Sequence, residues 1–341
     1  MKCAMLVKPF ELKIKEIEKP ILKRGEVLIR TKMTGICGSD VHAYKGQHPK
    51  RVPPVVLGHE MVGMVERITP DVKFIKVGDR VTVNPQIVCG KCESCKKGKQ
   101  NLCNSKILLG TKEWPGSYAE YISAPAEVVF KLPKSISDEE GTMVEPLAVA
   151  IHTIKKVEAP LGNSCLIFGS GTIGLMCLLS AKASGFTDIL ITDIVDYKLK
   201  IAEALGATLA LNSNKENIVE TVRRYTDNRG VDTIFIAAGT QTVVDDSLKC
   251  VAKEGSIFPI AQFGGVPVEF SMADIRYKET KVIGTTMYLN EDILTAINLL
   301  EKKIIDVKPL ITHKLPIEKI QRGIDLVDRN LEEAVKVVLK F

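Results

Sequence analysis

The 341-residue sequence has no long apolar run, and its N-terminus lacks a secretory signal. A membrane-spanning helix needs about 18 or more consecutive apolar residues, so we expect no membrane association. Residues 1–9 contain neither an apolar core nor a small-residue cleavage site, which indicates a cytoplasmic protein rather than a secreted one. Low-complexity segments and internal repeats are missing as well. A globular protein is therefore the class to consider.

The sequence also lacks a concentration of charge of one sign. Its formal net charge is +6, with 26% charged and 45% hydrophobic residues. Charge this diffuse can attract an anionic cofactor or substrate, but it does not predict a nucleic-acid partner. A chain of 341 residues exceeds the usual size of a single core, so two domains are expected.

The first part of the sequence favours short strands separated by loops. Strands are predicted at 26–31, 61–66 and 80–83, where β-branched residues cluster. Residues 84–115 show no periodicity, so something other than an apolar core must order them. Ser137 with Glu140 three residues later has the pattern of a capping box, which predicts a helix start.

From about residue 163, strands and helices alternate regularly. Strands are predicted at 165–168, 189–193, 208–211, 231–237, 256–261 and 281–285. Helices of about ten to fifteen residues between strands predict a doubly wound parallel sheet with helices on both faces. The tail adds helices near 291–303 and 317–329 and a strand at 334–339 without a further strand–helix unit. We expect this tail to return to the first domain.

A glycine-rich turn follows the first strand of that alternating region. In Gly169-Ser-Gly171-Thr-Ile-Gly174, the first glycine allows a tight turn and the second lets a pyrophosphate approach the backbone. The third lets the following helix pack closely on the strand, and the helix N-terminus offers free N–H groups to phosphates. The sequence therefore predicts a dinucleotide site rather than a plain glycine turn.

An acidic residue at the end of the second strand defines the expected nucleotide. Asp193 should accept hydrogen bonds from the adenosine ribose and repel a 2′-phosphate, so NAD is preferred over NADP. Lys198 and Lys200 nearby are the features that favour NADP. The residues assigned to the cofactor are Gly169, Gly171, Thr172, Ile173, Gly174, Asp193 and Lys198.

Four of the nine cysteines fall in one short loop, as Cys89-x2-Cys92-x2-Cys95-x7-Cys103. Four thiolates at this spacing can enclose one tetrahedral Zn²⁺ and leave no open position, which predicts a structural site. Free or disulfide-bonded cysteines, an iron–sulfur cluster and a nucleic-acid-binding zinc ribbon are the alternatives. Lysines surround the loop, but no aromatic residues are interleaved for stacking on bases.

A second set of metal-binding residue types lies in the first domain. Cys37 is followed by Ser39 and His42, and His59-Glu60 comes some twenty residues later. A thiol, an imidazole and a carboxylate can hold a catalytic zinc while one position stays open for substrate. Ser39 and His42 are suited to move a proton. Each residue alone is as well explained by a structural role.

Several motifs together resemble the zinc-dependent medium-chain alcohol dehydrogenases. They are Gly35–His42, Gly58–Gly63, Gly78–Val81, the Cys89–Cys103 loop and Gly169–Gly174, in that order. Glu145-Pro146-Leu147 with Ile151-His152 is similar to the polyol (sorbitol-type) and threonine dehydrogenase branch. The resemblance implies an α/β architecture, with a GroES-like β-rich catalytic domain (1–152 and 286–341) and a Rossmann NAD-binding domain (153–285). It also implies a homodimer or homotetramer, for which 280–288 is a candidate edge.

The resemblance also assigns roles to the catalytic residues. Cys37 and His59 are expected to bind catalytic zinc, with Glu60 and Glu145 sharing or exchanging the remaining protein position. Ser39 and His42 are similar to the proton relay of the family. Tyr44 either borders the substrate pocket or packs in the core, and His152 is expected to pack. The chain would then hold two Zn²⁺ ions, one catalytic and one structural.

These residues predict an oxidoreductase that transfers a hydride between NAD and a small alcohol. A secondary alcohol of a polyol, a sugar alcohol or a cyclitol is favoured, and the cleft between the domains is the expected location. Oxidation of a hydroxyamino acid, as by L-threonine 3-dehydrogenase, is the alternative. A phosphorylated sugar alcohol would use Lys45, Lys50 and Arg51, which otherwise form a solvated basic loop. A non-enzymatic zinc- and dinucleotide-binding protein is the remaining class.

Overall fold

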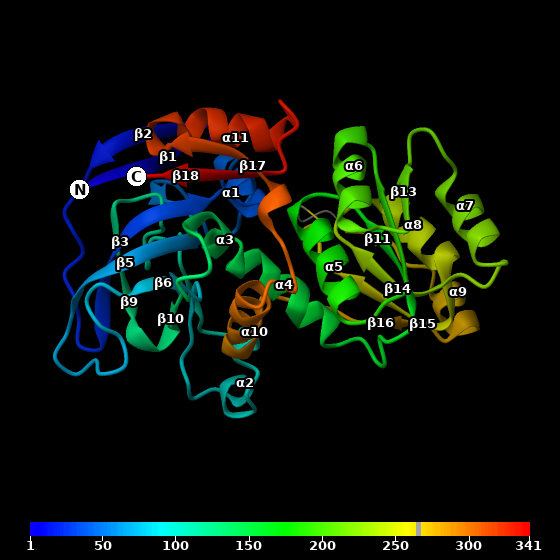
Figure 1. Cartoon of the computed structure of the whole chain (residues 1–341), viewed down its shortest axis with the longest axis horizontal. Helices are drawn as coiled ribbons and strands as arrows, with labels where there is room; N and C mark the ends of the chain where they lie inside the picture. Colours follow the sequence, from blue (N-terminus) through cyan, green and yellow to red (C-terminus); the bar gives the residue numbers. More distant parts are fainter. Residues whose placement is uncertain (264–266) are drawn as a thin grey trace. The chain divides into compact units, whose positions relative to one another are not determined.

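The computed structural model describes residues 1–263 and 267–341, which form two compact units. Unit 1 contains Met1–Ala148 and Tyr288–Phe341, and unit 2 contains Val149–Met287. Figure 1 shows that unit 1 is dominated by strands, whereas strands and helices alternate in unit 2. No helix within the described residues is long and apolar enough to cross a membrane.

A seven-stranded sheet forms the centre of unit 1, in the order β10-β6-β5-β3-β18-β17, with β9 also paired to β3. Its strands are β3 (Glu26–Gly35), β5 (Glu60–Ile68), β6 (Arg80–Val83), β9 (Tyr121–Pro125), β10 (Val129–Lys131), β17 (Ile311–Pro316) and β18 (Lys336–Lys340). The register pairs Gly35 with both Glu60 and Val338. The last strand of the chain therefore lies beside the strand that leads into Cys37.

A smaller sheet and two helices pack around a shared apolar core in unit 1. β1 (Lys2–Lys8) pairs with β2 (Glu11–Glu16) and β4 (Val55–Val56). Helix α1 (Gly38–Tyr44) contacts helix α11 (Ile320–Asp328), and both contribute to one buried cluster with β1. The strands β1, β2 and β17 and the helix α1 were not predicted from the sequence.

Short helices complete unit 1. The predicted capping box is confirmed: Ser137 accepts from the backbone of Glu140, whose carboxylate accepts from Ser137 N at the start of α3 (Asp138–Thr142). Helix α4 (Val144–Ile154) follows and carries Glu145 in its first turn; it belongs to unit 1 up to Ala148 and to unit 2 from Val149. The remaining elements are α2 (Glu93–Lys96), β7 (Gln86–Ile87), β8 (Ile107–Leu108), α10 (Asn290–Glu301) and the 3-10 turns η1 (Gln100–Leu102), η2 (Ala126–Val128), η3 (Lys308–Leu310) and η4 (Ile317–Lys319).

Unit 2 is a six-stranded parallel sheet in the order β13-β12-β11-β14-β15-β16. Its strands are β11 (Ser164–Phe168), β12 (Asp188–Asp193), β13 (Leu209–Asn212), β14 (Val231–Ile236), β15 (Val251–Pro259) and β16 (Lys281–Val282). The helices are α5 (Thr172–Ala183), α6 (Asp196–Leu205), α7 (Ile218–Tyr225), α8 (Gln241–Cys250) and α9 (Met272–Lys278). In Figure 1, α5 and α6 cover one face of this sheet and α7, α8 and α9 cover the other. The predicted doubly wound fold is confirmed.

One predicted strand is shorter than expected. The sequence predicted a strand over 281–285, but β16 contains only Lys281 and Val282. Ile283 N still donates a hydrogen bond to Ile257 O, but residues 283–285 do not belong to the strand. β16 is an edge strand with both residues exposed.

Candidate active site and zinc sites

The register of unit 1 brings three of the predicted zinc ligands together. One ligand atom each from Cys37, His59 and Glu60 lies within 4.8 Å of the other two. Cys37 follows the end of β3, and Glu60 begins the neighbouring strand β5. Gly35 makes this approach feasible, because a Cβ there would lie 2.3 Å from Glu60 Oε2.

The chemistry of this cluster fits a divalent zinc ion. Two anionic ligands and an imidazole are typical of a catalytic zinc with one open position. Glu60 Oε2 is buried; it makes an ion pair with the buried Lys336 but no well-aligned hydrogen bond to a described residue. Cys37 is only partly buried, which suits a site that admits substrate.

Glu145 lies beside the cluster but outside it. Its Oε1 accepts a hydrogen bond from Tyr288 Oη at 2.7 Å, and both side chains are buried. Burial raises the pKa of Glu145, with a further contribution from the charge of Glu60. The structure thus places Glu60 among the ligand atoms and Glu145 in contact with Tyr288, a partner that sequence reasoning did not identify.

Asp40 contacts two members of the cluster, Cys37 and His59. It is fully buried; its Oδ2 accepts from Cys37 N at 3.1 Å and from Tyr118 Oη at 2.9 Å. Its Oδ1 lies 3.5 Å from His59 Nδ1. Burial opposes the charge of Asp40, but His59 and Arg51 hold the pKa of the carboxyl well below its usual range. Asp40 is part of the Cys37–His42 motif, and its acidic side chain was the available sequence signal.

The relay residues lie on α1, which begins directly after Cys37. Ser39 is in the first turn of α1 and His42 is near its end. Ser39 Oγ accepts from Arg51 at 2.6 Å, and His42 Nδ1 lies 3.4 Å from Gln47 Oε1. One helical turn separates the two side chains, so both lie on the same face of the helix.

Other residues considered from the sequence have structural contacts. Tyr44 packs in the core of unit 1, where its hydroxyl donates to Phe10 O and accepts from Gln321. Of the two roles that the sequence predicts for Tyr44, the structure therefore supports packing in the core. His152 is buried on α4, as a packing role requires.

The predicted solvated basic loop is wrong for Arg51 and partly right for Lys45, which is half-buried. Arg51 is 6% exposed and contacts Ser39, Asp40 and His59. Lys45 forms an ion pair with Asp328. Lys50 is exposed, as predicted. The error has a physical cause: a loop sequence does not reveal that its arginine has buried acceptors to reach.

The four-cysteine loop forms the second cluster. The thiol sulfurs of Cys89, Cys92, Cys95 and Cys103 all lie within 4.8 Å of one another. The sulfurs of Cys89 and Cys103 are 3.6 Å apart, close to the roughly 3.8 Å expected between sulfurs of a tetrahedral site with Zn–S bonds of about 2.3 Å. Backbone N–H groups lower the pKa of Cys89 to about 6. The geometry and chemistry fit a structural zinc.

The glycine turn in unit 2 has the geometry of a phosphate cradle. Gly169 has φ +99°, and a Cβ at Gly174 would lie 1.8 Å from Gly169 O. A Cβ at Gly171 would meet nothing within 4 Å, so space is open there. Gly171 is the N-cap of α5, and no side chain caps the helix there, so the N-terminus of α5 with its partial positive charge lies at the glycine turn.

Asp193 lies beside this turn at the end of β12. Its Oδ2 accepts from Ser170 N at 2.7 Å, and its Oδ1 accepts from the backbone N–H groups of Ile194 and Val195. The carboxylate is therefore fixed next to the glycine turn. Lys198 on α6 is close enough to be influenced by the charge of Asp193, although burial lowers the pKa of Lys198.

Comparisons with known proteins agree with this arrangement. Residues 23–134 match the family model of the alcohol dehydrogenase GroES-like domain, and residues 172–302 match that of the zinc-binding dehydrogenases. The sorbitol dehydrogenase of Bacillus subtilis is 32% identical over 99% of this chain and 97% of its own length. The L-threonine 3-dehydrogenase of Bacillus velezensis is 35% identical (97% and 95% covered), and the D-arabitol-phosphate dehydrogenase of Enterococcus avium is 35% identical (95% and 92%).

Solved structures show the same likeness. An oxidoreductase of unknown specificity from Escherichia coli superposes with a TM-score of 0.94 at 31% identity, covering 99% of this chain and 98% of the other. An alcohol dehydrogenase from Escherichia coli CFT073 in complex with NADH gives a TM-score of 0.93 at 29% identity, covering 100% and 99%.

The chain belongs to the zinc-dependent medium-chain alcohol dehydrogenase family. It is an alcohol oxidoreductase whose cofactors are zinc and a nicotinamide dinucleotide.

Proposed function

We propose that this protein oxidises a secondary alcohol of a polyol, sugar alcohol or cyclitol with NAD as the acceptor. The observation that carries the proposal is the carboxylate of Glu60 within the Cys37–His59 cluster, with the buried Glu145 beside it. A relative named as a sorbitol dehydrogenase and one named as a D-arabitol-phosphate dehydrogenase support this substrate class.

Two alternatives within the family differ in their support. Oxidation of a hydroxyamino acid is favoured by the 35% identity to an L-threonine 3-dehydrogenase. A phosphorylated sugar alcohol has less support from the site, because Arg51 and Lys45 already have carboxylate partners. The non-enzymatic alternative has no support from the described residues.

In the proposed mechanism, Cys37, His59 and Glu60 would hold one zinc ion, and Cys89, Cys92, Cys95 and Cys103 would hold another. A zinc ion at the first site would supply a Lewis acid for the substrate oxygen, and NAD would supply the hydride acceptor. Ser39 accepts the proton of the substrate hydroxyl and releases its own proton toward His42. Glu145, whose Oε1 accepts from Tyr288 Oη, would exchange with Glu60 at the metal or bond to it through water.

The cofactor is proposed to bind unit 2. Gly169, Gly171 and Gly174 shape the turn, and the N–H groups of Thr172 and Ile173 bind the pyrophosphate. Asp193 accepts from the adenosine ribose, while Lys198 borders the same position.

The quaternary state is proposed to be a homodimer or homotetramer. β16 is an exposed sheet edge, and Tyr277 and Met272 on the neighbouring α9 are 73% and 70% exposed. A second copy pairing with this edge would satisfy its free backbone groups. Light scattering on the purified protein tests this, and a monomer at micromolar concentration contradicts it.

A substrate panel tests the proposed function. The purified, zinc-loaded protein is offered polyols, sugar alcohol phosphates, cyclitols and L-threonine with NAD, and NADH absorbance is followed. We expect kcat/KM for an unphosphorylated polyol or cyclitol to exceed that for threonine by about tenfold or more, the equivalent of about 1.4 kcal/mol. A preference for threonine, or no turnover with two zinc ions bound per chain, overturns the proposal.

A further inference from the structure

Arg51 has the most contacts of the buried cations near the candidate active site. It lies on the loop between α1 and β4, and its side chain is 6% exposed. Its Nη1 donates to Ser39 Oγ at 2.6 Å and lies 3.4 Å from Asp40 Oδ1. Its Nη2 lies 3.2 Å from His59 Nδ1 and 3.5 Å from Leu109 O. One guanidinium therefore contacts the proposed relay hydroxyl, a proposed zinc ligand and the acid behind both.

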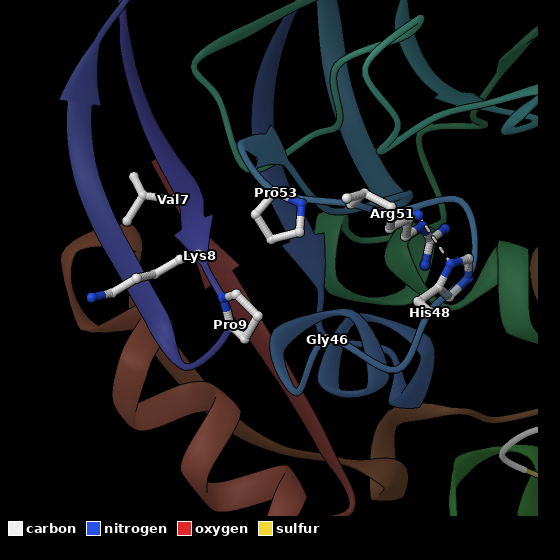
Figure 2. A pocket seen from close by; sticks show the side chains of 8 residues that line it. Val7, Lys8, Pro9, Gly46, His48, Arg51 and Pro53 are labelled. Carbon is white, nitrogen blue, oxygen red and sulfur yellow. Dashed lines mark hydrogen bonds between the residues drawn. The ribbon is translucent and has the colours of Figure 1, made fainter.

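The backbone N–H of Arg51 also makes a hydrogen bond. His48 Nδ1 accepts from Lys50 N at 3.2 Å and from Arg51 N at 3.1 Å. Burial and the nearby Arg51 charge lower the pKa of His48 to about 4, so the ring is neutral and can accept at Nδ1. Figure 2 shows His48 and Arg51 joined in this way on one side of a pocket, with Val7, Lys8 and Pro9 on the other.

The direction of the Arg51–Ser39 hydrogen bond has a chemical consequence. A guanidinium can only donate, so Ser39 Oγ must accept and its own proton must point elsewhere. A short charge-assisted bond of this kind also restricts rotation of the hydroxyl. Ser39 Oγ is therefore held in place while its own O–H group can still donate a hydrogen bond to another group.

We propose that Arg51 is a positioning residue for the proton relay, which holds Ser39 Oγ in one orientation so that a lone pair of Oγ accepts the substrate proton while its own proton points away along the relay. The proposal rests on the proposed function, because it assigns the relay to Ser39. Asp40 balances the Arg51 charge, so the pair adds orientation without a net charge next to the zinc ligands. Lysine cannot fully replace Arg51. The planar guanidinium of Arg51 reaches Ser39 and His59 with two separate nitrogens, whereas a lysine has a single ammonium nitrogen.

Substitution of Arg51 tests the proposal by kinetics. Arg51→Gln should lower kcat by about 10–100-fold, with KM changed by less than about threefold, because the alcohol still binds but its proton is poorly directed. A larger solvent deuterium isotope effect on kcat should accompany the loss. Arg51→Lys should retain intermediate activity. The matched control is Lys50→Gln, which removes an exposed cation one residue away and should leave kcat within about twofold.

A double-mutant cycle separates positioning from general damage to the fold. If Arg51 acts through Ser39, the Ser39→Ala/Arg51→Gln protein should be no slower than Ser39→Ala alone. Multiplicative losses in the double variant overturn the proposal, as does an unchanged kcat in Arg51→Gln. Retained melting temperature and two bound zinc ions show that the variants are folded.

Chemical rescue gives an independent readout. Arg51→Ala removes the guanidinium that donates to Ser39 Oγ. Millimolar guanidinium that binds in its place should restore part of the activity of Arg51→Ala, but none in the Ser39→Ala/Arg51→Ala protein. Equal rescue in both overturns the link to Ser39. If the wild-type protein oxidises no alcohol, the proposed function fails. The Arg51–Ser39 link is then tested by a double-mutant cycle on the free energy of unfolding in urea, in which the interaction energy of the two residues must differ from zero.

Discussion

Lys336 Nζ lies 2.5 Å from Glu60 Oε2, and both side chains are 1% exposed. The two residues come from opposite ends of the chain and meet because β18 and β5 both pair with β3. Burial lowers the pKa of Lys336, but Glu60, Cys37 and Glu145 together raise it above its ordinary value. Glu60 therefore has a cationic neighbour as well as a place among the proposed zinc ligands.

Removal of this lysine should destabilise the metal-free protein. Lys336→Met leaves the Glu60 carboxylate buried without a cation, which typically costs about 3–5 kcal/mol. With zinc bound the loss should be smaller, because the metal then compensates the carboxylate. The free energy of unfolding in urea, measured with chelator and with zinc, checks both values. Lys340→Met, at the exposed end of the same strand, is the control and should change stability by less than about 0.5 kcal/mol. Equal losses with and without zinc would contradict the assignment of Glu60 as a ligand.

Cys37→Ser should remove the catalytic zinc without unfolding the protein. We expect one zinc ion per chain instead of two, turnover lowered on the order of 100-fold or more, and NAD affinity retained. Metal analysis and NAD titration by fluorescence measure these quantities. Cys177→Ala, a buried thiol of unit 2, is the control and should keep both ions. Full activity in Cys37→Ser would refute the ligand assignment.

Cys95→Ser should act on stability first. Its thiol is one of four that order a loop without an apolar core, so one lost ligand opens the site and releases the zinc. Each kcal/mol lost lowers the melting temperature by about 2–4 °C in a domain of this size. Calorimetry with metal analysis tests this. A variant that keeps its melting temperature after losing one zinc would show that the loop needs no metal.

The glycine turn allows a contrast between two alanine substitutions. Gly174→Ala places a Cβ 1.8 Å from Gly169 O, so the turn must shift and the protein should lose stability. Gly171→Ala meets no protein atom within 4 Å, so stability should hold while the Kd for NAD rises by about tenfold or more. Thermal melting and NAD titration distinguish the two. Unchanged NAD affinity in Gly171→Ala would place the pyrophosphate elsewhere.

Asp193→Asn should relax the choice of nucleotide. The amide keeps one oxygen, which can accept either from Ser170 N or from Ile194 N and Val195 N but not from both sides, and it no longer repels a 2′-phosphate. We expect the ratio of kcat/KM for NADP to that for NAD to rise by about tenfold or more, which corresponds to about 1.4 kcal/mol. A wild-type protein that uses both nucleotides equally well would contradict the role of Asp193.

The elements best predicted from the sequence are those whose pattern is local. The limits of β6 were predicted to the residue, because a short β-branched strand shows its pattern within one segment. The helix α1 was missed, since seven residues following a metal-ligand motif give too little periodicity. The strand predicted over 281–285 was too long, because pairing at a sheet edge depends on the neighbouring strand.

The sequence by itself determined the chemistry: the four-cysteine spacing, the glycine turn and the Cys37, His59 and Glu60 set are each read from short segments. Only the tertiary structure decided which groups surround them. Arg51, Tyr288 and Lys336 meet the candidate site through strand register and loop packing, which bring residues together regardless of their separation along the chain. Their partners are therefore fixed by where β3, β5 and β18 pair, and no local spacing encodes that pairing.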